Sequence, residues 1–114
     1  MKILAALAVL LLMGACKGEP EYSVIGMQGA MKAVSVPAES AANIGYYREV
    51  IEAECPRSRI CIMSFFVGPS SVSWPLTDSM VEAQTAQYNR NPNSGMDRLL
   101  LACRLVDGGA SECF

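Results

Sequence analysis

Cysteines are the residues of this chain with the clearest chemical potential, because the 114 residues include five of them and no histidine. Four lie in its second half, at spacings of C-x5-C and C-x9-C: Cys55, Cys61, Cys103 and Cys113. Structural zinc sites usually use closer cysteine pairs, such as C-x2-C, or add histidine. An even number of cysteines in a small exported domain instead predicts two disulfides. We therefore expect no metal site and no free thiolate nucleophile.

The pairing of the four cysteines has three solutions. Cys61 and Cys103 both lie in apolar runs that could form neighbouring strands, at a separation suited to a bridge. This favours Cys61–Cys103, which leaves Cys55–Cys113 to tie the end of a helix to the tail. The local pairing, Cys55–Cys61 with Cys103–Cys113, is nearly as well supported and stays open.

Other catalytic arrangements are weak in this sequence. The lack of histidine excludes Ser–His and Cys–His mechanisms, and neither a G-x-x-x-x-G-K-[ST] phosphate loop nor a G-x-S-x-G elbow occurs. Glu49 and Glu52 lie beside Arg48, a pattern typical of a solvated helix surface. Glycosidase-like chemistry would need a carboxylate pair from separate elements, such as Asp78 with Glu49. We expect a protein that is not an enzyme, with a small carboxylate-dependent hydrolase as the enzymatic alternative.

The fifth cysteine, Cys16, directly follows an apolar run. The thirteen residues from Ile3 to Ala15 contain no charged or polar side chain, and a single Lys2 precedes them. As a helix the run spans about 20 Å, which is shorter than the roughly 30 Å of membrane hydrocarbon. A basic start, a short apolar middle and small final residues are typical of a secretory signal peptide.

The junction of this run with Cys16, the sequence M-G-A-C of residues 13–16, resembles the lipobox of bacterial lipoproteins, in which leucine is usual at the position of Met13. The resemblance implies that a peptidase removes residues 1–15 and that Cys16 carries two or three lipid chains, a stable anchor. Lys17 in place of Asp implies, by enteric-type sorting, an outer-membrane protein that faces the periplasm. An ordinary signal peptide with an incidental cysteine and a buried N-terminal helix are the alternatives.

The rest of the chain has the length of one small domain. Residues 16–21 are expected to form a lipid-anchored tether, and residues 22–114 a single domain. The formal net charge of the whole chain is −2, the arginines are scattered and no repeat occurs, so nucleic-acid binding is not expected. The expected partners are the membrane, through the lipid on Cys16, and an envelope protein, with no cofactor.

The elements that would position these residues follow from periodicity and breakers. Residues 31–36 and the apolar run 59–67 are expected to be strands, the second a central one. Residues 38–54 are expected to form a helix after Pro37, and residues 77–90 a second helix with Thr77 or Asp78 as its cap. Residues 96–106 fit a buried strand slightly better than a third helix.

These elements predict an α+β fold of order β-α-β-α-β. Two helices would cover a roughly three-stranded sheet in a two-layer, disulfide-stabilised domain. The first helix should bury one face, made of Ile44, Tyr47, Ile51 and Cys55, whose spacings are 3, 4 and 4 residues.

The segment of residues 75–95, PLTDSMVEAQTAQYNRNPNSG, resembles a pattern in small exported proteins of Gram-negative bacteria that have no assigned activity. The matching residues are Pro75, Leu76, Thr77, Asp78, Gln84, Gln87, Tyr88, Asn89, Asn91, Ser94 and Gly95. The structural interpretation is a capped helix that ends in an Asn/Gly turn. The functional interpretation is a polar recognition surface of Gln84, Gln87, Asn89 and Asn91.

Trp74 precedes this segment and has two interpretations as well. It could fold back as a lid on the core between helix and sheet. Alternatively it could be an exposed anchor for a partner, because tryptophan is common in binding hot spots.

Together these observations predict a membrane-anchored envelope lipoprotein with a binding or structural role in the periplasm. The alternative function is inhibition of an exogenous hydrolase, as in small disulfide-bonded lipoproteins that inhibit lysozyme. Their all-β barrel differs from the helix-containing fold expected here.

Overall fold

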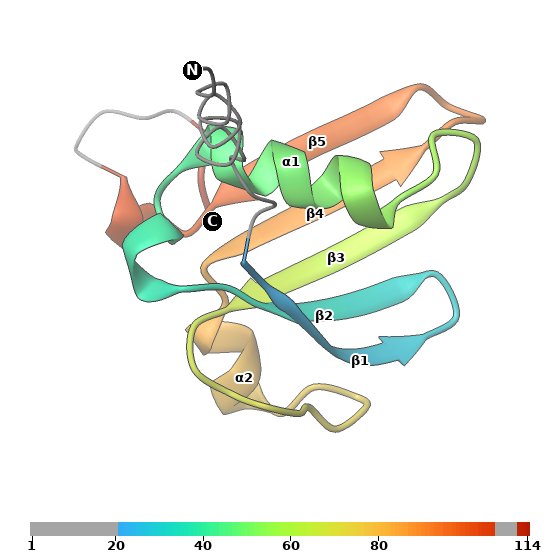
Figure 1. Ribbon diagram of the computed structural model, residues 1–114. Helices are drawn as coiled ribbons and strands as arrows, with labels where there is room; N and C mark the ends of the chain where they lie inside the picture. Colours follow the sequence, from blue (N-terminus) through green and yellow to red (C-terminus); the bar gives the residue numbers. More distant parts are fainter. Residues whose placement is uncertain (1–20, 107–111) are drawn as a thin grey trace, which may run out of the picture.

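The computed structural model describes residues 21–106 and 112–114, which form an α+β domain around one five-stranded mixed sheet (Figure 1). The strands lie side by side in chain order: β1 (Ser23–Gln28), β2 (Met31–Ser35), β3 (Cys61–Phe66), β4 (Ala86–Asn91) and β5 (Met96–Leu101). Strands β2 and β3 are parallel, whereas the other neighbours are antiparallel. A parallel pair needs a crossover, and helix α1 (Ile44–Glu54) supplies it.

The α+β class, the two helices and the two disulfides are confirmed, but the sheet has five strands rather than the expected three. Strand β1 lies in a segment for which no strand was predicted, and it pairs with β2 through a turn at Gly29, which has a φ of 61°. Strand β5 confirms a strand rather than a helix in residues 96–106, but the expected burial is wrong for its first half, because residues 96–98 are exposed. The strand ends at Leu101 and is followed by the short helix η3 (Cys103–Leu105).

The predicted helix over residues 77–90 is wrong in its second half. Helix α2 (Asp78–Ala83) begins after the predicted cap, where the Thr77 side chain accepts a hydrogen bond of 3.2 Å from the Met80 amide. The chain then becomes β4, in which residues 86, 88 and 90 are buried and residues 87, 89 and 91 are half-buried. This alternation has the period of a strand, and helix-forming residues at 82–84 concealed its start.

Helix α1 covers one face of the sheet and contributes three buried residues to the core. Tyr47, Val50 and Ile51 are fully buried, and the Tyr47 ring meets the Phe65 ring of β3 edge-on at 4.8 Å between centroids. The helix is shorter than predicted, because residues 38–40 form a separate turn, η2 (Ala38–Ser40), and Asn43 is the cap. Ile44 therefore lies in the first turn and is 54% exposed, so its predicted burial is wrong, whereas that of Tyr47, Ile51 and Cys55 is confirmed.

The disulfides join Cys55 to Cys61 and Cys103 to Cys113, with Cα–Cα distances of 6.1 Å and 4.9 Å. The favoured pairing of Cys61 with Cys103 is wrong, and the local alternative is correct. The reason is that β4 lies between β3 and β5. Strands β3 and β5 are therefore two strand spacings, about 9.5 Å, apart. A disulfide can bridge a Cα–Cα distance of only about 7 Å.

Among residues 21–106 and 112–114, no helix has the length and apolar character needed to cross a membrane. The predicted signal peptide and the lipidation site at Cys16 lie outside the described residues.

Candidate functional site

The face of the sheet opposite α1, called here the outer face, is the candidate site. Successive strand residues point to opposite faces, and the strand register groups the outward residues into rows. One row crosses all five strands through Gln28, Met31, Ile62, Asn89 and Arg98. The next row contains Gly26, Ala33, Ser64, Gln87 and Leu100.

The outer face is poor in charge. Arg98 is the one charged residue among the outward positions of the five described strands. These positions are Ser23, Gly26, Gln28, Met31, Ala33, Ser35, Ile62, Ser64, Phe66, Gln87, Asn89, Asn91, Met96, Arg98 and Leu100. Ala33 and Phe66 of this set are fully buried, so the outer face is partly covered. The other outward side chains are exposed or half-buried and include a single charged residue.

Three of the four predicted amide residues lie in line on this face, along β4 rather than on a helix. Gln87 and Asn89 are half-buried, and their side chains form no hydrogen bond within the part of the chain that the structure describes. Asn91 accepts a bond of 2.9 Å from the Asn93 amide and shapes the β4–β5 turn. Gln84 is only 4% exposed, and its Oε1 has no hydrogen-bond partner among the described groups. Gln84 is therefore not part of an exposed surface.

Trp74 packs on the outer face, on the opposite side of the sheet from the core under α1. A Cβ atom at Gly26 of β1 would come within 3.3 Å of the Trp74 Nε1 and 2.6 Å of a Val72 methyl carbon. The side chains of Val72 and Trp74 thus lie so close to Gly26 that a larger residue there would force the Val72 side chain to move. The indole is half-buried, so Trp74 is neither a lid on the α1 core nor a free anchor.

A hollow of about 580 Å³ adjoins Trp74. It is lined by Gln28, Met31, Trp74, Pro75, Leu76 and Val81. Helix α2 is held beside it by Arg104, whose guanidinium donates to the carbonyl oxygens of Glu82, Ala83 and Gln84 at 3.0–3.3 Å. A cation is well placed at the C-terminal end of a helix. The hollow is the apolar end of the outer face.

The face of the sheet under α1 differs from the outer face because its charged side chains are paired with other groups of the domain. Arg90 of β4 is almost buried, with 6% of its side chain exposed, and donates to the Cys55 carbonyl at 3.0 Å. Arg48 of α1 bonds to Asp97 of β5 at 2.9 Å, and this bond holds the pKa of the Asp97 carboxyl below its usual range. The guanidinium groups of Arg48 and Arg90 lie 5.6 Å and 5.4 Å from the Tyr88 ring centroid. These groups tie α1 to the sheet.

Two carboxylates near the end of α1, those of Glu52 and Glu54, are engaged in similar contacts, whereas Glu49 is exposed and forms no ion pair within the described part of the chain. Glu54 accepts from the Tyr22 hydroxyl at 2.6 Å and from the Lys32 ammonium at 3.0 Å. The bond from Tyr22 lowers the pKa of Glu54, partial burial opposes this, and Lys32 adds to the lowering. Glu52 pairs with Arg57 at 2.7 Å. An ionised, paired carboxylate is poorly suited to act as a general acid.

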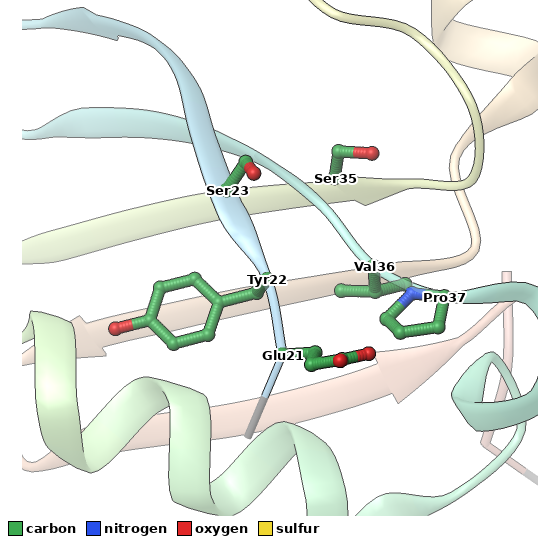
Figure 2. Close-up of a pocket in the computed structure, with 6 residues that line it drawn as sticks. All are labelled: Glu21, Tyr22, Ser23, Ser35, Val36 and Pro37. Carbon is green, nitrogen blue, oxygen red and sulfur yellow. The ribbon is translucent and has the colours of Figure 1, made fainter. Parts of the chain in front are cut away.

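A second hollow of about 470 Å³ lies where the domain begins, between the start of β1 and the end of β2. Figure 2 shows the six residues that line it: Glu21, Tyr22, Ser23, Ser35, Val36 and Pro37. The Tyr22 ring points away from Pro37, toward α1 (Figure 2). The polar groups that line the hollow come from one carboxylate, two serines and one tyrosine. Within the described ranges, no cluster of three or more cysteine or acidic residues could hold a metal ion.

No known protein family, curated protein or solved structure matches this chain.

Proposed function

We propose that this protein is an envelope lipoprotein, anchored by lipid on Cys16 to the outer membrane, that binds a periplasmic protein through the outer face of its sheet. The observation that carries the binding role is the near absence of charge from that face. Charged residues are depleted in the buried centre of protein interfaces.

The chemistry of the outer face supports recognition rather than simple exposure to water. Gln87 and Asn89 each present an amide with donors and an acceptor that the described chain leaves unused. Half-buried Ile62 and Leu100 lie beside them on β3 and β5. Apolar area provides affinity and unmatched amides provide specificity, so the combination suits a protein surface of mixed polarity.

The proposed compartment rests on two features. Disulfides persist in oxidising compartments such as the periplasm, and all four cysteines after Cys16 are paired. The M-G-A-C junction supplies the anchor in this proposal.

The lipid anchor is tested by metabolic labelling with palmitate. We expect the wild-type chain to incorporate label and the Cys16→Ser variant to incorporate none. Equal labelling of both would rule out Cys16 as the modified residue.

The binding surface is tested by crosslinking in intact envelopes with two arginine variants. Asn89→Arg adds a charge to the centre of the outer face, whereas Ala53→Arg adds the same charge to an exposed position on α1. We expect partner adducts to be lost in Asn89→Arg and retained in Ala53→Arg. Retention in both would contradict the proposal. The same variants, assayed against an exogenous lysozyme, test the inhibitor alternative.

A further inference from the structure

The two edges of the sheet differ in how regular they are. Strand β1, one edge, has an irregular register between Val24 and Gly26, and the side chains of Val72 and Trp74 lie against Gly26. Strand β5, the other edge, pairs with β4 in an unbroken register over all six of its residues (Figure 1). Irregularities in an edge strand hinder its pairing with a further strand. Of the two edges, β5 is therefore the one suited to such pairing.

Two hydrogen bonds at the end of β5 show which of its backbone groups point away from β4. The Ala102 amide donates to the carbonyl of Thr85, the residue directly before β4, at 2.9 Å. The Leu101 carbonyl accepts from the Phe114 amide of the tail at 3.1 Å, on the opposite side of the strand. Backbone groups point alternately to the two sides of an antiparallel strand. The odd-numbered residues of β5 therefore present their backbone groups to its open side.

Asp97 and Leu99 each have an N–H and a C=O group at this open side. Within the described chain these groups form no hydrogen bond. The next residue along the edge is already in use, because Cys113 of the tail pairs with Leu101 in a one-residue parallel bridge. The chain's own tail thus adds to the edge as a strand does. Donors and acceptors repeated at strand spacing are matched by another extended backbone, so the rest of the edge suits a further strand.

A second copy of this chain fits the edge poorly. Two β5 strands that extend the sheet across a two-fold axis run antiparallel, with one residue opposite itself. Centring the pair on Arg98 opposes two guanidinium groups, and centring it on Asp97 opposes two carboxylates, and like charges directly opposite are destabilising. Centring it on Leu99 or Leu100 requires the backbone of Leu101, which the tail uses. The edge therefore favours a different polypeptide.

The side chains of β5 define the chemistry of the strand that fits. Arg98 points to the outer face, is exposed and forms no ion pair within the described part of the chain. Side chains directly opposite each other on neighbouring strands lie about 5 Å apart on the same face, so an acidic residue opposite Arg98 would pair with its guanidinium. Leu99 and Leu100 are half-buried, so apolar residues opposite them would increase the buried apolar area. The row of outward residues that ends at Arg98 would then continue into the partner.

We infer that the open side of β5 binds an extended segment of the periplasmic protein partner, which adds to the sheet as a further strand and places an acidic residue opposite Arg98. The inference rests on the proposed function, because it specifies how the partner of the outer face is held. Backbone hydrogen bonds to Asp97 and Leu99 supply affinity, and Arg98 selects the sequence and its register. The rest of the partner would lie over the outer face beside β4.

The experiment is photocrosslinking in intact envelopes from position 96, which is exposed on β5, in the full chain with two variants of Asp97. Asp97→Pro removes the outward N–H group and Asp97→Ala keeps it, whereas both remove the ion pair with Arg48. We expect the adduct yield to fall about tenfold in Asp97→Pro and less than about twofold in Asp97→Ala, because only proline deprives the added strand of a donor and blocks its approach. Mass spectrometry should locate an acidic residue about two positions from the crosslinked one, as 98 is from 96.

A charge pair of variants keeps the test decisive if thermal unfolding shows that Asp97→Pro does not fold. Arg98→Glu should lower the adduct yield about tenfold, because it opposes two carboxylates, and Arg98→Lys should lower it less than about threefold. Equal yields for folded Asp97→Pro and Asp97→Ala, or equal yields for the two Arg98 variants, would overturn the inference. No adduct from position 96, or adducts only with a second copy of this chain, would overturn it as well.

Photocrosslinking from position 89 separates failure of this inference from failure of the proposed function. An adduct from position 89 whose yield is the same in all four variants would leave binding by the outer face intact and overturn the role of the β5 edge. Absence of any adduct from position 89 would contradict the proposed function itself. We expect the adduct from position 89 to fall in parallel with that from position 96.

Discussion

The two faces of the sheet are built from alternate residues of the same strands, yet they treat polar groups in opposite ways. Under α1, Arg90 is nearly buried and donates to the Cys55 carbonyl, and the guanidinium groups of Arg48 and Arg90 lie 5.6 Å and 5.4 Å from the Tyr88 ring centroid. On the outer face, Gln87 and Asn89 alternate with Tyr88 and Arg90 along β4, and their side chains have no hydrogen-bond partner in the described structure. The first face uses its polar groups for stability, and the second leaves them available.

The largest expected difference between the faces concerns packing. Phe65 is fully buried against Tyr47, whereas its neighbour Ser64 points to the outer face and is half-buried. Phe65→Ala should lower the free energy of unfolding by about 3–5 kcal/mol, the range for large core deletions. Ser64→Ala should change it by less than about 0.5 kcal/mol. Chemical denaturation measures both, and similar losses would show that the outer face is a second core.

A smaller difference in stability is expected between alanine variants of two arginines that lie on neighbouring strands. Arg90→Ala removes a buried, charge-assisted hydrogen bond to the Cys55 carbonyl, which should cost about 2 kcal/mol. Arg98→Ala removes an exposed side chain without an ion pair and should cost almost nothing. Denaturation midpoints compare the two, and a loss in Arg98→Ala equal to that in Arg90→Ala would contradict the assignment of the faces.

Trp74 tests the boundary of the outer face. Its indole is half-buried against Gly26 and lies outside the core cluster. Trp74→Ala should therefore cost about 1–2 kcal/mol of stability, clearly less than Phe65→Ala. If the hollow beside Trp74 belongs to the binding surface, Trp74→Ala should also weaken the free energy of partner binding by about 2 kcal/mol, the scale of a hot-spot residue. Trp74→Phe is the matched control and should retain most of the stability and most of the partner binding. A loss of stability in Trp74→Ala as large as that in Phe65→Ala would make Trp74 a structural residue.

The smallest expected effect is on the pH dependence of the melting temperature. The pKa of Glu54 is lower in the folded chain than in the unfolded chain, so its carboxylate stabilises the fold above its unfolded pKa. This stabilisation is lost as pH falls through the folded pKa. Glu54→Gln should therefore reduce the drop in melting temperature between pH 7 and pH 3. Glu49→Gln is the control, since Glu49 is exposed and forms no ion pair within the described residues. An unchanged drop in Glu54→Gln would show that the Tyr22–Glu54 contact does not matter.

The sequence predicted the parts of this fold that local patterns determine. Local patterns predict the strand at β3 from its apolar run, the start of α2 from its cap at Thr77, and the buried face of α1 from the spacing of Tyr47 and Ile51. Strand β4 was missed because helix-forming residues at 82–84 hide the alternation that follows them. The disulfide pairing depends on the order of the strands, which no local pattern contains.

The candidate site was predicted in composition but not in geometry. The amides at 87, 89 and 91 were recognised as a polar set, and the strand period of β4 places them in line. Gln84 belonged to the same set, yet it is buried where the chain leaves α2 and enters the sheet. Burial of this kind depends on tertiary packing. The charge-poor character of the outer face also required the register of all five strands.

Site-specific photocrosslinking in the native envelope tests the central claim most directly. A photoreactive residue at position 89 reports on the outer face, and one at position 53 reports on the exposed side of α1. The account predicts a discrete protein adduct from position 89 that is absent from position 53. Adducts of equal yield at both positions, or an adduct at position 53 alone, would contradict the assignment of recognition to the outer face.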